Sequence, residues 1–193
     1  MISALLLAAG ESRRMGDFKQ LLPLRDKTFV EHCVDSLLGT RVCEVIVVTG
    51  HRESDVRRAL GGRRVIFAHN SEYKSGMTSS IKRGMLAVSE GSSACVIALV
   101  DQPLIDPNVI NTIIETYEKE QPLIVIPTYQ GKNGHPILLD LKLKEAILNM
   151  DSSQALREVV HAHTSETSRV EVSDNRVTED CDLPEDYERI LRV

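Results

Sequence analysis

The stretch that decides the fold is ISALLLAAGESRRMGDFK, residues 2–19, near the beginning of the chain. Its apolar part, residues 2–7, has the composition of a buried strand and runs directly into Ala8-Ala9-Gly10. Small residues and a glycine allow the backbone of a loop to approach a ligand closely. Arg14 and Lys19 lie in the same loop, and cations there indicate an anionic ligand such as phosphate. An ordinary strand-to-helix loop with solvated charges is the alternative, because the stretch matches neither common glycine-rich phosphate motif.

Composition narrows the class of protein. The chain has 193 residues, enough for one domain over residues 1–193 with a sizeable core. Its formal net charge of −5 disfavours binding to nucleic acid, which usually needs a basic face. No apolar run approaches the ~20 residues of a membrane span, and the first residues lack the basic region of a secretory signal. We therefore expect a cytoplasmic protein that works without nucleic acid or membrane, with its cysteines reduced.

Short apolar runs alternate with amphipathic segments along the whole chain. Strands are expected at residues 2–7, 45–49, 65–68, 95–100, 123–127, 137–139 and 170–172. Helices are expected at residues 28–38, 53–60, 81–88, 107–118, 141–148, 154–160 and 184–191. This alternation predicts an α/β fold in three layers, in which helices cover both faces of a mostly parallel sheet. Ligands bind such sheets beyond the carboxyl ends of the strands, which places Ala8-Ala9-Gly10, Gly50-His51 and Asp101 at one edge.

Two aspartates are candidate metal ligands. Asp101 follows the apolar run 95–100 directly, so its carboxylate would lie at the ligand edge of the sheet. Asp182 belongs to a second acidic cluster far along the chain. Mg²⁺ prefers oxygen ligands and usually takes one or two carboxylates together with substrate phosphates. The alternative is that both carboxylates cap the backbone, Asp101 at the turn that follows it and Asp182 at the closing helix.

Three further polar side chains have both a structural and a functional interpretation. Ser79 and Ser80 precede the helix expected at residues 81–88, so they either cap it or bind a ligand at its N-terminus. His135 lies between Gly134 and Pro136, which is a rigid setting for a polar group. A lone histidine is more often structural than functional, so its position alone assigns it no role.

Five motifs, taken in order, reveal a family resemblance. They are Leu7-Ala8-Ala9-Gly10-x-Ser12-x-Arg14-Met15-Gly16-x-x-Lys19, Ser75-Gly76-Met77-Thr78-Ser79-Ser80, Leu99-Val100-Asp101-Gln102-Pro103, Gly134-His135-Pro136 and Asp180-x-Asp182-x-Pro184-Glu185-Asp186-Tyr187. Together they span nearly the whole chain and resemble the nucleotidyltransferases related to the molybdenum cofactor nucleotidyltransferases. Within that group the chain is most similar to the molybdenum cofactor cytidylyltransferases and the molybdenum-hydroxylase accessory proteins. The guanylyltransferase branch usually has a Gly-Gly loop where this chain has Ala8-Ala9-Gly10.

The resemblance implies a Rossmann-like nucleotidyltransferase fold that joins CMP from CTP to molybdenum-bound molybdopterin and releases pyrophosphate. It further implies Mg²⁺ as cofactor, CTP and a molybdopterin-type compound as substrates, and a molybdenum hydroxylase as a partner. The residues that match functional positions of the family are Leu7, Ala8, Ala9, Gly10, Ser79 and Ser80 for the nucleotide, Arg14 and Lys19 for its phosphates, Asp101 and Asp182 for Mg²⁺, and His135 and Arg157 for the acceptor. Arg14, Lys19 and Asp101 are the expected catalytic residues.

One segment departs from the family pattern. Cytidylyltransferases of this branch often carry Gly-Asp-x-Gly-Ala-Arg, whereas residues 150–157 read MDSSQALR and keep only Arg157. Because this segment would contact the acceptor, two alternatives stay open: a different phosphorylated acceptor, and a non-catalytic role in handling the cofactor for a molybdenum hydroxylase. An oxidoreductase that uses a dinucleotide is a further alternative, which the missing G-x-G-x-x-G motif disfavours.

Overall fold

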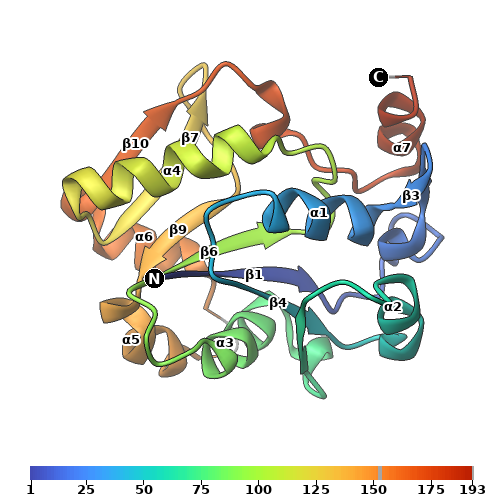
Figure 1. Ribbon diagram of the computed structural model, residues 1–193, viewed down its shortest axis with the longest axis horizontal. Coiled ribbons are helices and arrows are strands. Elements are labelled where there is room, and N and C mark those ends of the chain that lie inside the picture. The colour runs from blue at the N-terminus through green and yellow to red at the C-terminus, as the bar shows by residue number, and fades with distance from the viewer. Residues whose placement is uncertain (152–153, 193) are drawn as a thin grey trace.

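The computed structural model describes residues 1–151 and 154–192, which form a mixed β-sheet with helices on both sides (Figure 1). The strands are β1 Ile2–Ala8, β4 Glu44–Thr49, β5 Ile66–His69, β6 Ala94–Leu99, β7 Ile124–Tyr129, β8 Lys132–Asn133, β9 Ile137–Asp140 and β10 Thr167–Glu171. Their order across the sheet is β10-β7-β9-β6-β1-β4-β5, and β8 pairs with β7. β1 runs parallel to both of its neighbours, whereas β9 runs antiparallel to β6 and β7. The expected α/β fold with a mostly parallel sheet is confirmed.

The helices form the two outer layers. They are α1 Phe29–Leu38, α2 Glu53–Ala59, α3 Met77–Ala87, α4 Pro107–Glu120, α5 Lys144–Leu148, α6 Leu156–Ala162 and α7 Pro184–Ile190, and a small sheet of β2 Pro23–Leu24 and β3 Lys27–Thr28 precedes α1. Figure 1 shows α1 and α4 on one side of the sheet and α3 and α5 on the other. No helix among the described residues is long and apolar enough to cross a membrane.

The side chains of β1 alternate between the two cores. Ala4 and Leu6 are fully buried in the core that α1 and α4 complete, whereas Leu5 and Leu7 belong to the core under α3 and α5. Successive side chains of a strand point to opposite faces of the sheet, so a strand covered on both faces reads as a continuous apolar run. This double burial explains why the strand is apolar except at Ser3, whose buried hydroxyl donates to the Glu44 carboxylate.

A glycine lets α3 pack closely on the central strands. A Cβ atom at Gly84 would lie 2.7 Å from Cδ1 of Leu5 and 3.0 Å from Cγ2 of Val48, well inside the normal separation of packed carbon atoms. The helix therefore lies directly against the sheet. Its first turn, with Met77 and Ser80, lines the same pocket as the end of β1.

Every strand and helix expected from the sequence has a counterpart, with most ends displaced by one to three residues. The helix expected from residue 81 instead begins at Met77, with Gly76 as its N-cap, so Ser79 and Ser80 lie inside its first turn. The interpretation of these two serines as caps that precede the helix is therefore wrong. Their hydroxyls are available for other partners.

The closing helix begins at the expected residue, Pro184, but its capping residue differs from expectation. α7 has Leu183 as its N-cap, and the Asp186 carboxylate accepts hydrogen bonds from the N–H groups of Asp182 and Leu183. Asp186, and not Asp182, therefore satisfies the free N–H groups at this end. The side chain of Asp182 points to partners elsewhere, which are described below.

Candidate active site

The loop after β1 is fastened by its own side chains. Gln20 is 1% exposed, and its amide nitrogen donates to the carbonyl of Ala8 at 3.0 Å and to that of Gly10 at 2.9 Å. Its amide oxygen accepts from the Ser12 hydroxyl, which in turn accepts from the N–H of Lys19. Ser12 has a left-handed backbone, with φ 56°, which persists only where the surrounding structure holds it. The loop is therefore a preformed turn.

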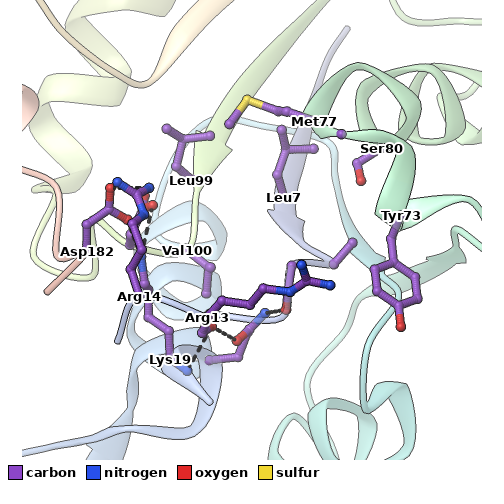
Figure 2. Close-up of a pocket in the computed structure, with 16 residues that line it drawn as sticks. Leu7, Arg13, Arg14, Lys19, Tyr73, Met77, Ser80, Leu99, Val100 and Asp182 are labelled. Atoms are coloured by element: carbon purple, nitrogen blue, oxygen red, sulfur yellow. Dashed lines mark hydrogen bonds and ion pairs between the residues drawn. The ribbon is translucent and has the colours of Figure 1, made fainter. Parts of the chain in front are cut away.

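A pocket of about 340 Å³ lies between this loop, the end of β6 and the first turn of α3. Of the residues predicted from the sequence, those that line it are Leu7, Ala9, Gly10, Arg14, Lys19, Ser80, Asp101 and Asp182. Figure 2 shows Asp182 and Arg14 at one side of the pocket and Ser80 at the other. The predicted carboxylates and the cations that match phosphate positions therefore share one end of the pocket, and a neutral hydroxyl lies at the opposite end.

Two carboxylates from distant parts of the chain converge on Lys19. Its ammonium lies 2.6 Å from Oδ1 of Asp182 and 3.4 Å from Oδ2 of Asp101, and only 8% of its side chain is exposed. The Arg14 guanidinium lies 2.8 Å from Oδ2 of Asp182. The backbone N–H of Cys181 donates to the carbonyl of Asp101 at 3.0 Å, so the two acidic segments are also tied through their backbones. The sequence alone could not show that these carboxylates meet.

The environment of Asp101 fits a divalent cation. Burial raises the pKa of its carboxyl, the nearby Lys19 ammonium opposes that shift, and the charges of Asp180 and Asp182 add to it. Its Oδ1 is buried and has no hydrogen-bond partner among the described residues. A buried oxygen of this kind normally has a partner, and a cation shared with Asp182 would be one. The alternative that Asp101 caps the following turn finds no support, because its carboxylate hydrogen-bonds Lys19.

The protein alone does not complete a metal site. The described residues contain no group of three histidine, cysteine, aspartate or glutamate side chains that could hold a metal ion. Mg²⁺ commonly takes one or two carboxylates and completes its shell with water and substrate phosphates. Asp101 and Asp182 therefore suit a metal that binds together with a phosphorylated ligand.

Ser79 and Ser80 are adjacent but face different partners. Ser80 lines the pocket. The Ser79 hydroxyl instead lies within hydrogen-bond distance of the carbonyls of Glu72 and Gly76, to either of which it donates. Ser80 is therefore part of the pocket lining, whereas Ser79 is not.

Three other predicted residues lie outside the lining of the pocket. Ala8 is fully buried in the core beneath the loop. His135 is half-buried, its backbone N–H donates to the carbonyl of Val177, and burial lowers the pKa of its imidazole. Arg157 is exposed on α6, and residues 152–153 of the same divergent segment lie outside the described part of the chain. The acceptor roles of His135 and Arg157 stay predictions.

Two buried amides that shape the pocket were missed from the sequence. Gln20 follows Lys19 inside the first motif, so its place in the motif was a usable signal. Asn70 follows β5 and donates to both serines of α3. Its position just beyond the carboxyl end of a strand was the only hint of its importance.

The comparison with known families agrees with this geometry. The family described as the MobA-like NTP transferase domain matches residues 4–167. The chain belongs to this family. It is therefore an enzyme of the nucleotidyltransferase class.

Two characterised relatives cover almost the whole of this MobA-like chain. Nicotine blue oxidoreductase of Paenarthrobacter nicotinovorans is 28% identical, and the match covers 98% of this chain and 96% of the relative. The molybdenum cofactor cytidylyltransferase of Escherichia coli K12 is 25% identical, with 96% of this chain and 93% of the relative covered.

A solved structure has the same fold. Rv0371c from Mycobacterium tuberculosis H37Rv superposes with a TM-score of 0.86 at 28% identity, covering 100% of this chain and 97% of the other. A second structure of Rv0371c, in complex with manganese, gives a TM-score of 0.82 at 26% identity, with coverages of 100% and 98%. The Rossmann-like nucleotidyltransferase fold implied by the motifs is confirmed.

Proposed function

We propose that this MobA-like enzyme transfers CMP from CTP to molybdenum-bound molybdopterin, giving molybdopterin cytosine dinucleotide and pyrophosphate. The observation that carries the proposal is the meeting of Lys19 with Asp101 and Asp182 at one end of the pocket. A cation beside two carboxylates suits a triphosphate that arrives with a divalent metal. The relative from Escherichia coli that is named for this activity supports CTP and the pterin as the substrates.

The chemistry is a displacement at phosphorus. The terminal phosphate of the pterin attacks the α-phosphorus of CTP, a new P–O bond forms, and the bond to the β-phosphate breaks to release pyrophosphate. The nucleophile is already an anion, so the site needs no strong general base. Catalysis then comes from positioning and from neutralising the phosphate charge, which is the task of Arg14 and Lys19. Mg²⁺ held by Asp101 and Asp182 would add positive charge at the phosphates.

Arg14 and Lys19 would divide that task. The Lys19 side chain is 8% exposed and fixed by its two carboxylates, so it marks one position for a phosphate oxygen. The Arg14 side chain is 72% exposed and is free to turn from Asp182 toward a ligand. Lys19 would then hold the phosphates in one place, and Arg14 would move as the substrate enters and the product leaves.

The remaining predicted residues take supporting roles in the proposal. The backbone at Leu7, Ala9 and Gly10 would follow the base and ribose, with Ser80 at the far end of the pocket. Ala8 and Ser79, which do not line the pocket, would support the residues that bind the nucleotide. His135 and Arg157 would contact the acceptor. The proposal treats residues 1–193 as one cytoplasmic domain, whose product would be used by a molybdenum hydroxylase.

One observation favours a second candidate. Nicotine blue oxidoreductase is 28% identical to this chain over nearly its full length. An oxidoreductase activity is therefore the second candidate function. It gives no role, however, to the carboxylates gathered around Lys19, which the transferase explains.

The experiment follows both activities in parallel. The protein is incubated with CTP, Mg²⁺ and molybdenum-bound molybdopterin, and pyrophosphate and the dinucleotide are measured. GTP replaces CTP in a second arm, and a third arm follows the oxidation of NADH or NADPH with nicotine blue as the electron acceptor. Pyrophosphate with CTP supports the proposal. Turnover with GTP alone contradicts the choice of base, and turnover only with a nicotinamide cofactor contradicts the transferase.

A further inference from the structure

We propose that Asn70 is a positioning residue that fixes the hydroxyl of Ser80 as a hydrogen-bond donor toward the bound nucleotide. The inference rests on the proposed function, because it concerns the neutral end of the same pocket. Asn70 follows β5 and is 4% exposed, and it is not itself among the pocket-lining residues. It therefore acts through Ser80, which lines the pocket.

The partners of Asn70 determine which way its amide faces. Its Oδ1 accepts from the N–H of Glu72 at 3.0 Å, a bond that only the oxygen of an amide can accept. The Nδ2 group therefore faces the other way, where it donates to Oγ of Ser79 at 2.9 Å and to Oγ of Ser80 at 3.0 Å. The backbone N–H of Asn70 also donates to the carbonyl of Thr49 at 2.8 Å, which anchors the residue to the end of β4.

The two serines use this amide differently. Each hydroxyl accepts one of the amide hydrogens, so each must direct its own hydrogen elsewhere. For Ser79 that direction is toward the carbonyl of Glu72 or Gly76. The Ser80 hydroxyl makes no other hydrogen bond within residues 1–151 and 154–192, and Ser80 lines the pocket. The Ser80 hydrogen is therefore the one directed at the ligand.

A donor fixed at this place selects the chemistry of the ligand atom opposite it. That atom has to be an acceptor, as N3 and O2 of cytosine and the oxygens of the ribose are. Sites built to hydrogen-bond a substrate discriminate strongly against analogues that leave the buried group unpaired. Asn70 thereby contributes to binding of the nucleotide without touching it.

The Asn70→Asp variant tests this directly. Aspartate keeps the shape and the oxygen that accepts from Glu72, but a carboxylate cannot donate to the serines. Both hydroxyls then turn toward it, and the Ser80 hydrogen is withdrawn from the pocket. In calorimetric titration with CTP and Mg²⁺ we expect the Kd to rise about tenfold, which corresponds to the loss of one hydrogen bond.

A double-mutant cycle separates positioning from general damage. Ser80→Ala, Asn70→Asp and the double variant should all show the same weakening of CTP binding, because each removes the same donor. Asn111→Asp on α4 introduces the same charge outside the pocket lining and should leave the Kd unchanged. Thermal unfolding of each variant confirms that it is folded, and Ser80→Ala alone remains decisive if Asn70→Asp does not fold.

Three outcomes overturn the inference. Binding of CTP by Asn70→Asp or Ser80→Ala as tightly as by the wild type shows that the donor is not used. A double variant that binds much more weakly than Ser80→Ala shows that Asn70 acts in general structure and not through this hydroxyl. Failure of the wild type to bind CTP overturns the proposed function itself, which the first two outcomes leave intact.

Discussion

Replacing each metal-site aspartate by asparagine should separate stability from activity. Asp182 has two cations close to it, at 2.6 Å and 2.8 Å, whereas Asp101 has one at 3.4 Å. Burial also raises the pKa of Asp101, so the fold stabilises its charged form poorly. We therefore expect Asp182→Asn to lower the free energy of unfolding and Asp101→Asn to leave it unchanged or to raise it.

The magnitude follows from the burial of the pairs. The Lys19 side chain is 8% exposed and that of Asp182 is 28% exposed, which places their ion pair between the surface and the interior. Exposed pairs contribute about 0–1 kcal/mol, and breaking a buried pair costs about 3–5 kcal/mol. For Asp182→Asn we expect the free energy of unfolding to fall by about 1.5 kcal/mol, which lowers Tm by about 3–6 °C in a chain of this size. For Asp101→Asn we expect a change within about 0.5 kcal/mol.

Activity should fall in both variants regardless of stability. Each loses a proposed ligand of the metal that neutralises the triphosphate, so we expect CMP transfer to slow by about 100-fold or more. Tm is measured by calorimetry at neutral pH without added metal, and transfer by pyrophosphate release at saturating CTP. A larger loss of Tm in Asp101→Asn than in Asp182→Asn would refute the electrostatic reasoning. Normal transfer by Asp101→Asn would refute its metal role.

Three further perturbations test the fold and the site. Gly84→Ala should lower the free energy of unfolding by about 1–3 kcal/mol in denaturant titration, because the new methyl group would overlap Leu5. The hydrogen bond from Arg63 holds the pKa of Asp35 below its usual value, so this pair stabilises the fold above the ordinary aspartate pKa and loses that effect as pH falls through the lowered value. Arg63→Met should accordingly lower Tm at neutral pH by an amount that shrinks in acid. Added Mn²⁺ or Mg²⁺ with CTP should raise the Tm of the wild type, and Asp101→Asn should lose most of that increase.

Local patterns predicted the elements of the sheet well. Continuous apolar runs identified β1 and β6 because both strands are covered on two faces. The expected start of a helix at residue 28 agrees within one residue with α1, because Thr28 is its N-cap and donates its N–H to the Glu31 carboxylate. The antiparallel direction of β9 between β6 and β7 could not be predicted, because a short apolar run does not encode which neighbours it pairs with.

The sequence predicted those residues of the candidate site that carry a charged side chain at or just after the carboxyl end of an expected strand. Lys19 lies in the loop after a strand and Asp101 directly follows one, so their types and places indicated an anionic ligand and a metal ion, respectively. The contact between Asp101 and Asp182 depends on how the end of the chain returns to the sheet, which no local pattern specifies. Asn70 is a neutral side chain that acts through a neighbour, and its role appears only in three dimensions.

The turn that Gln20 closes has a consequence for how such enzymes diverge. Its hydrogen bonds join Ala8, Gly10 and Ser12 within one short segment and make no use of the acceptor side of the molecule. The described part of residues 150–157 contacts α3 instead, where the carbonyls of Gln154 and Met150 accept from the Thr78 hydroxyl and the Lys82 ammonium. A substitution in this segment that changes the proposed acceptor therefore reaches the pocket through α3 and leaves the hydrogen bonds of the Gln20 turn in place.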